Sequence, residues 1–198
     1  MPKQTRLTGG TGRRKIALAR FVVPAWLGLV FAVPAGAQTY VKWDQPPDPA
    51  QPDNLYLGWD EESICWEFGP TVADDFVCDT ADPVTHVRWW GSFQGWTQPY
   101  PLPPDEMPLH FHILFWTDVP ADPDDPNSFS HPGVVIHEIL PPDYSYSCQF
   151  VGWEYDPRTG EYLACFVFDQ ELEEWQWFFQ DPTGDPGIYW ISIIACYY

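Results

Sequence analysis

Aspartates in two short segments of this chain have the chemistry of candidate cation ligands. Asp74 and Asp75 are adjacent, and a second group lies in one loop, which contains Asp118, Asp122, Asp124, Asp125 and Asn127. Ca²⁺ is bound by carboxylate and carbonyl oxygens, so both segments are candidate Ca²⁺ sites. The loop lacks the glycine and the final glutamate of an EF-hand, and its prolines stiffen it, which favours weak binding or none. The alternative is that these aspartates begin turns.

Other chemically active groups point less clearly to a site. Neighbouring residues of a strand face opposite ways, so Asp74 and Asp75 cannot form one catalytic pair. His110 and His112 form a His-x-His pair without an identifiable third zinc ligand, and ordinary surface histidines are the alternative. A carbohydrate-active hydrolase needs two facing carboxylates, which cannot be picked out among 28 acidic residues. We therefore expect no enzymatic activity and keep the hydrolase as the alternative function.

Tryptophan is the other residue type that could bind a ligand. The chain has 12 tryptophans, and the candidate binding residues are Trp89, Trp90, Trp96, Trp116 and Trp153. Exposed aromatic faces stack on the apolar faces of neutral sugars or dock protein partners. Trp89 and Trp90 are adjacent in a strand-like segment, so they point to opposite faces. The alternative is that the sandwich and a loop cover both faces of this strand. The pattern predicts a non-catalytic module that binds a polysaccharide or a cell-surface protein.

Charge excludes several classes of partner. Of nine basic residues, six lie in the first 20 positions, and only Lys42, Arg88 and Arg158 follow residue 37. All 28 acidic residues follow residue 37, so 3 − 28 gives a net charge of −25 for residues 38–198. A field of this sign repels polyanions, so we expect neither nucleic acid nor an anionic membrane surface as a partner.

The N-terminal segment has the pattern of a signal peptide, which we assign to residues 1–37. A basic stretch precedes an apolar run over residues 21–33, which is too short to span a bilayer as a helix. Small residues, Ala35-Gly36-Ala37, end the segment where signal peptidase cleaves. We expect a secreted, cell-surface or periplasmic protein with no membrane span after cleavage. An uncleaved membrane anchor is the alternative.

Five cysteines in an exported chain predict two disulfides and one leftover thiol. Proximity in the sequence favours Cys65 with Cys78 and Cys148 with Cys165, which leaves Cys196 unpaired. No C-x-x-C motif occurs, so neither a zinc ribbon nor a thioredoxin-like site is indicated.

These residues must be positioned by strands. Residues 38–54 read as a short strand and a proline-rich arm, and residues 55–198 as one β-sandwich domain. Aromatic and β-branched segments alternate with turn residues, which predicts strands near 62–68, 75–78, 84–93, 109–117, 133–140, 146–155, 161–168, 174–179 and 187–197. Residues 170–175 could form a single helical turn, and seven Asp-Pro pairs predict turns. The expected fold is an all-β, antiparallel, jelly-roll-like β-sandwich.

The chain also resembles a family of exported bacterial domains of unknown function. The resemblance rests on motifs along most of the chain after residue 37, including Ala73-Asp74-Asp75-Phe76, Trp89-Trp90-Gly91-Ser92-Phe93 and Ile188-Tyr189-Trp190-Ile191-Ser192. It implies a β-sandwich with no assigned activity. Relatives continue with further aromatic segments, which implies that C-terminal strands are missing here and that an open sheet edge remains.

Overall fold

The computed structural model describes most of the chain from Val41 onwards. The described residues are 41–51, 55–57, 60–65, 69–78, 80–93, 96, 103–181 and 187–197. The expected signal peptide, residues 1–37, lies outside the described residues. Within the described part of the chain, no helix is long and apolar enough to cross a membrane.

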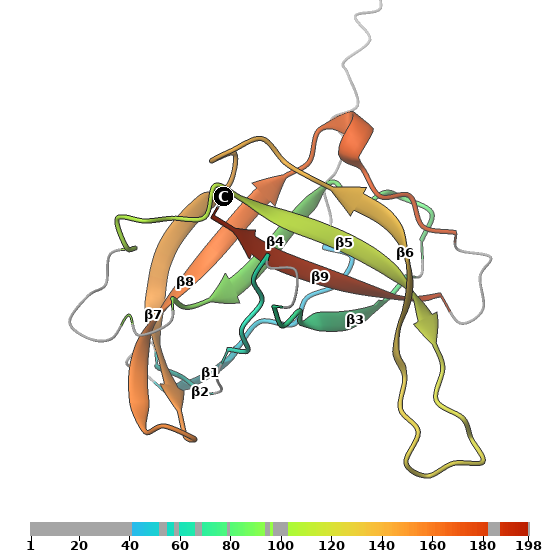
Figure 1. Cartoon of the computed structure of the whole chain (residues 1–198), viewed down its shortest axis with the longest axis horizontal. Coiled ribbons are helices and arrows are strands. Elements are labelled where there is room, and N and C mark those ends of the chain that lie inside the picture. Colours follow the sequence, from blue (N-terminus) through green and yellow to red (C-terminus); the bar gives the residue numbers. More distant parts are fainter. Residues whose placement is uncertain are drawn as a thin grey trace, which may run out of the picture. The chain divides into compact units, whose positions relative to one another are not determined.

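Among the described residues, nine strands form two sheets (Figure 1). The strands are β1 (Asp48–Gln51), β2 (Leu55–Leu57), β3 (Ala73–Val77), β4 (His86–Gly91), β5 (His110–Val119), β6 (His131–Ile139), β7 (Ser147–Asp156), β8 (Glu161–Glu171) and β9 (Ile188–Cys196). The five-stranded sheet has the order β1-β2-β7-β8-β4, and the four-stranded sheet has the order β3-β9-β5-β6. The strand pairings are antiparallel, except that β2 runs parallel to β7. The prediction of an all-β sandwich is confirmed.

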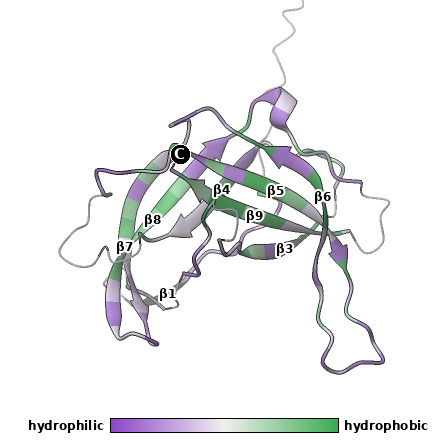
Figure 2. Cartoon of the chain, in the orientation of Figure 1, coloured by the Kyte–Doolittle hydropathy of each residue, from purple (hydrophilic) through white to green (hydrophobic). Residues whose placement is uncertain are grey.

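The core lies between the two sheets, and β5 illustrates how the sequence builds it. Phe111, Ile113 and Phe115 alternate along β5 and are buried, as the period of two predicts. Figure 2 shows apolar residues in the middle of this strand and polar residues on either side of them. The first core cluster contains Phe76, Val87, Ile113, Phe115, Ile139, Leu172 and Phe178. The second core cluster contains Phe111, Ala164, Phe166 and Phe168.

Strand β9 lies inside the four-stranded sheet, paired with β3 on one side and β5 on the other. The edges of that sheet are β3 and β6. The proline-rich arm also contains a strand, β1, at the edge of the five-stranded sheet. An edge strand tolerates Pro49 because one of its sides needs no hydrogen-bond partner.

Turns follow three of the seven Asp-Pro aspartates, Asp122, Asp125 and Asp156, whereas Asp48 lies in strand β1. In the β5–β6 hairpin, the Asp125 amide donates to the Asp122 carbonyl at 3.1 Å, and the Ser128 amide donates to the Asp125 carbonyl at 3.0 Å. The β7–β8 hairpin turns at Gly160, whose φ of 77° suits glycine. A single 3-10 turn, η1 (Glu174–Gln176), lies close to the helical turn expected at 170–175.

Candidate functional site

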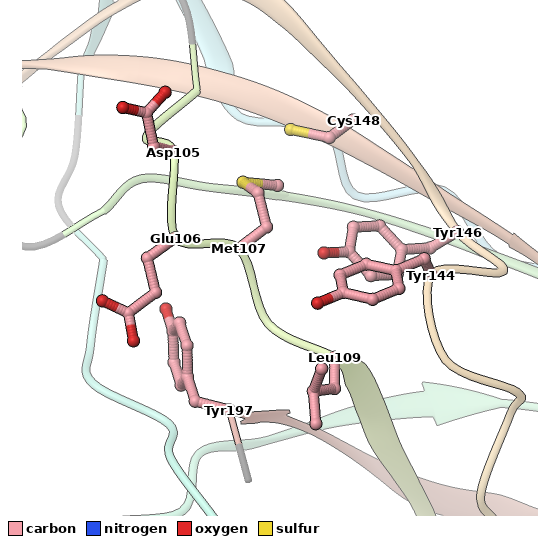
Figure 3. Close-up of a pocket in the computed structure, with 8 residues that line it drawn as sticks. All are labelled: Asp105, Glu106, Met107, Leu109, Tyr144, Tyr146, Cys148 and Tyr197. Carbon is pink, nitrogen blue, oxygen red and sulfur yellow. The ribbon is translucent and has the colours of Figure 1, made fainter.

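The described residues form an open recess of about 660 Å³ (Figure 3). We call it the tyrosine recess, and its lining residues are Asp105, Glu106, Met107, Leu109, Tyr144, Tyr146, Cys148 and Tyr197. They come from four separate places in the chain: the segment before β5, the β6–β7 loop, the start of β7 and the residue after β9. The volume falls within the usual range for small-ligand sites, roughly 300 to 1,000 Å³.

Hydrogen bonds between these segments fix the walls of the recess. The Tyr144 amide donates to the Leu109 carbonyl at 2.6 Å. The Tyr146 hydroxyl donates to the Pro108 carbonyl at 2.6 Å, and its ring meets the ring of Phe111 edge to face. The Leu109 amide donates to the Cys196 carbonyl at 2.7 Å, next to Tyr197. Tyr144 and Tyr146 are thus held by the segment just before β5, and the same segment bonds to the residue that precedes Tyr197.

Tyr144 has an unusual backbone conformation. Its φ is 55°, and no other non-glycine residue in the described part of the chain has a positive φ. Left-handed backbone of this kind costs a bulky residue about 1 kcal/mol or more. Nevertheless, 62% of the Tyr144 surface is exposed at the recess, so core burial does not offset the cost. Strain at an exposed aromatic residue is typical of binding sites.

The recess presents neutral donors beside carboxylates. Burial raises the pKa of the Tyr146 hydroxyl, and burial together with the nearby Glu106 carboxylate raises the pKa of the Tyr197 hydroxyl. Figure 3 shows the side chain of Glu106 beside the ring of Tyr197. Burial also raises the pKa of the Cys148 thiol to about 11. At neutral pH the recess therefore offers the Tyr197 hydroxyl and the Cys148 thiol as donors and the Tyr146 hydroxyl oxygen as an acceptor, beside the side chains of Asp105 and Glu106. No cationic side chain lines it among the described residues.

A second group of interest is a buried carboxyl pair, Asp60 and Glu154. Glu154 alternates with Trp153 on β7, so it points away from the second core cluster, and only 5% of it is exposed. The two carboxyl groups are near enough to each other and to Ser92 for each to influence the other's pKa. Neither Asp60 Oδ2 nor Glu154 Oε1 has a donor among the described residues, which a proton shared between them would satisfy.

Burial and the proximity of the two carboxyl groups both favour the protonated form of the pair. Burial raises the pKa of Glu154, and the adjacent Asp60 carboxyl raises it further, to about 8. Burial likewise raises the pKa of Asp60. Sequence reasoning missed this pair because Asp60 follows β2 and Glu154 lies 94 positions later, without a shared motif.

A model of one protein family matches residues 41–198, which is most of the chain. The chain belongs to the DUF7901 family, a domain of unknown function. No curated protein and no solved structure is significantly similar to it. Membership of this family therefore assigns no activity to the tyrosine recess or to the carboxyl pair.

Three of the candidate tryptophans of the DUF7901 domain pack against its core. Trp89 stacks on Phe168 with ring centroids 5.4 Å apart, and it contacts both core clusters. Trp96 and Trp153 are partly buried against the second core cluster, and Trp153 also meets Phe150 edge to face. Their aromatic faces are thus occupied by neighbouring side chains.

The other two tryptophans lie on outer faces of the DUF7901 sandwich. Trp90 is half-buried opposite Val167, on the face of β4 that points away from Trp89. Trp116 lies on the outer face of the four-stranded sheet, directly across from Trp190. The Trp116 indole N–H donates to the Ser192 hydroxyl at 3.0 Å. None of the five candidate tryptophans is among the residues that line the recess.

Two of the candidate metal ligands of the DUF7901 domain, Asp118 and Asp122, accept hydrogen bonds from protein groups. Asp118 accepts from the Trp190 indole N–H at 2.8 Å and from the Ser130 hydroxyl. Asp122 Oδ1 accepts from the Asp124 amide at 2.9 Å, as an aspartate that begins a turn does. Asp74 and Asp75 lie opposite Ile191 and Trp190 respectively, so they face different sides of the sheet, as expected. Within the described residues, no three His, Cys, Asp or Glu side chains form a group that could hold a metal ion.

The expected disulfide partners lie apart, and all five cysteines are free thiols. The Cys78 amide bonds to the Gly187 carbonyl at one end of β9, whereas the Cys65 amide bonds to the Ala195 carbonyl at the other end. Eight strand residues separate these points by roughly 26 Å, far beyond the reach of a disulfide. Cys148 and Cys165 lie opposite Phe168 and Gly152 and point to different faces of the five-stranded sheet. Strand topology therefore excludes both expected pairs.

Proposed function

We propose that this domain is an exported, non-catalytic binding module that takes a neutral carbohydrate in the tyrosine recess. One observation carries the proposal: Tyr144 is held in a left-handed backbone conformation, largely exposed, beside two further tyrosines and two carboxylates. A chain does not need a strained, solvent-exposed tyrosine to stabilise its core.

The chemistry of the recess matches a neutral sugar. Pyranose rings have apolar C–H faces that pack on aromatic rings, and their hydroxyls hydrogen-bond to groups such as the Asp105 and Glu106 carboxylates and the tyrosine hydroxyls. The net charge of −25 for residues 38–198 disfavours anionic polysaccharides. The N-terminal pattern of residues 1–37 supports export, which would expose the recess to extracellular glycans.

Binding is favoured over the alternative, a carbohydrate-active hydrolase. Glycoside hydrolysis uses two carboxyl groups that flank the scissile bond at separations of about 5 to 9 Å. Glu154 is only 5% exposed and lies beside Asp60, so this pair is not open to a sugar. Asp105 and Glu106 are neighbours in the sequence on one side of the recess and do not flank it.

A glycan array with the secreted protein, followed by calorimetric titration of the bound sugar, tests the proposal. Intact mass should give Gln38 as the first residue of the secreted form. We expect Tyr144→Ala to weaken binding about tenfold or more, as truncation of a central aromatic contact does. Tyr162→Ala is the matched control, because Tyr162 is an exposed tyrosine on β8 that lies outside the recess lining.

Two further arms of this experiment locate the ligand. Equal affinity in Ca²⁺ and in EDTA is expected if the carboxylates accept sugar hydroxyls directly, and loss in EDTA would mean that they act through Ca²⁺. If Trp116→Ala abolishes binding while Tyr144→Ala leaves it unchanged, the recess is the wrong location and the outer face of the four-stranded sheet is the site. Binding to cells without binding to any glycan would instead indicate a cell-surface protein as the partner.

A further inference from the structure

Cys65 and Cys196 are far apart in the sequence, but a short parallel pairing of their two segments brings them together. Ile64 forms a parallel bridge with Ala195, the Cys65 amide donates to the Ala195 carbonyl at 2.9 Å, and the Ala195 amide donates to the Ser63 carbonyl at 3.1 Å. The Ser63 hydroxyl adds a bond to the Ile193 carbonyl at 2.7 Å. In this register the next residues along each segment, Cys65 and Cys196, are direct neighbours.

The spacing of the two thiols fits a covalent bond. Paired strands lie about 4.7 to 4.9 Å apart, within the range of Cα separations in disulfides, about 4.4 to 6.8 Å. Burial, together with the nearby Cys65 thiol, raises the pKa of the Cys196 thiol. Cys65 is exposed, whereas only 2% of Cys196 is exposed, so an oxidant can reach one sulfur and the other is protected.

We propose that Cys65 and Cys196 form a disulfide by thiol–disulfide exchange with a small or protein disulfide as oxidant. The exposed Cys65 thiolate attacks one sulfur of the oxidant, whose S–S bond breaks, and the released thiolate takes up a proton. The Cys196 sulfur then attacks the Cys65 sulfur and loses its proton, and the second half of the oxidant leaves as a thiol. The two cysteines lose two electrons, and the oxidant gains them.

The disulfide would connect segments that matter for the whole domain. It closes a loop of 131 residues (196 − 65), which by chain entropy restricts the unfolded state strongly. It also ties the C-terminal end of β9, and with it the adjacent Tyr197 of the tyrosine recess, to the segment that carries Asp60. The inference does not depend on what the recess binds.

Tryptic mapping under non-reducing conditions tests it on the full chain. Cleavage after Lys42, Arg88 and Arg158 separates the cysteines into residues 43–88 (with Cys65 and Cys78), 89–158 (with Cys148) and 159–198 (with Cys165 and Cys196). After incubation with oxidised glutathione, we expect residues 43–88 to be joined to residues 159–198, two hydrogens lighter than their sum. Residues 89–158 should remain separate.

Serine variants identify the bond within the joined fragments. The link should disappear in Cys65→Ser and in Cys196→Ser and persist in the matched controls Cys78→Ser and Cys165→Ser. Oxidation should also raise Tm by roughly 10 °C in the wild type and in neither variant that lacks the link. Separate fragments after oxidation, or a link that survives in Cys65→Ser, would overturn the proposal.

Discussion

Replacing Glu154 by glutamine should change how the stability of the domain depends on pH. In the wild type, the folded pair of Glu154 and Asp60 keeps a proton that the unfolded chain releases, because burial and the second carboxyl raise the pKa of Glu154 from 4.5 to about 8. Between these pH values the unfolded state binds fewer protons than the folded state, so the free energy of unfolding falls as pH rises. The stabilisation is complete below about pH 4.5 and is lost as pH approaches 8.

The size of this effect follows from the same shift. One proton corresponds to about 1.4 kcal/mol per pH unit, so the pair can contribute a fall of up to about 2.7 kcal/mol between pH 5 and pH 7. In Glu154→Gln, the amide N–H₂ replaces the shared proton as a permanent donor to Asp60 Oδ2, and this part of the pH dependence should disappear. Asp60→Asn should act in the same way from the other side of the pair.

Urea unfolding at pH 5, 6, 7 and 8 measures the effect. The relevant quantity is the difference in unfolding free energy between wild type and Glu154→Gln at each pH, because the other acidic residues contribute equally to both. Glu161→Gln is the control, since Glu161 is exposed at the start of β8. Parallel curves for wild type and Glu154→Gln would refute the shared proton, and so would an equal flattening in Glu161→Gln.

Two further predictions test the assignment of sequence-predicted site residues to structural roles. Trp89→Ala should lower the free energy of unfolding by about 3 to 5 kcal/mol, measured by urea titration, because the stacking on Phe168 and contacts with both core clusters are lost; a change below 1 kcal/mol would show that Trp89 is not a core residue. Asp118→Ala should lower the free energy of unfolding by about 1 to 3 kcal/mol, because the Trp190 indole N–H and the Ser130 hydroxyl lose their acceptor. Calcium should leave the wild-type Tm unchanged if Asp118 serves only as that acceptor, and a rise in Tm that Asp118→Ala removes would instead identify it as a calcium ligand.

The positions of strands β3 to β9 were readable from the sequence because their signals are local, whereas the strand predicted at 174–179 begins with the turn η1. Proline, glycine and aspartate mark the turns, and alternation along β5 identifies Phe111, Ile113 and Phe115 as core residues. The strand order could not be predicted from the sequence, and for that reason the predicted cysteine pairs were wrong. The N-terminal bridge at Ile64 runs beside the end of β9, so Cys65 meets the cysteine farthest from it in the sequence.

The tyrosine recess could not be predicted either, because no single segment contains it. Its tyrosines come from the β6–β7 loop and from the residue after β9, and only the docking of these segments brings Tyr144, Tyr146 and Tyr197 together. Periodicity describes which face of a strand a residue occupies, but Tyr144 lies in a loop, where its left-handed conformation depends on a bond to the Leu109 carbonyl. Sequence patterns therefore favoured the tryptophans, which lie in strand-like segments.

The motifs on which the sequence-based resemblance rests have mainly structural roles. In Ala73-Asp74-Asp75-Phe76, Phe76 is buried and meets Phe115 edge to face at 6.1 Å. In the segment that begins at Trp89, Phe93 packs edge to face on Phe166 at 5.3 Å. Residues that build the contact between two sheets specify the fold whatever the domain binds. The core contacts of these motifs thus account for the β-sandwich, whereas the proposed ligand is to be sought at Tyr144, which is largely exposed.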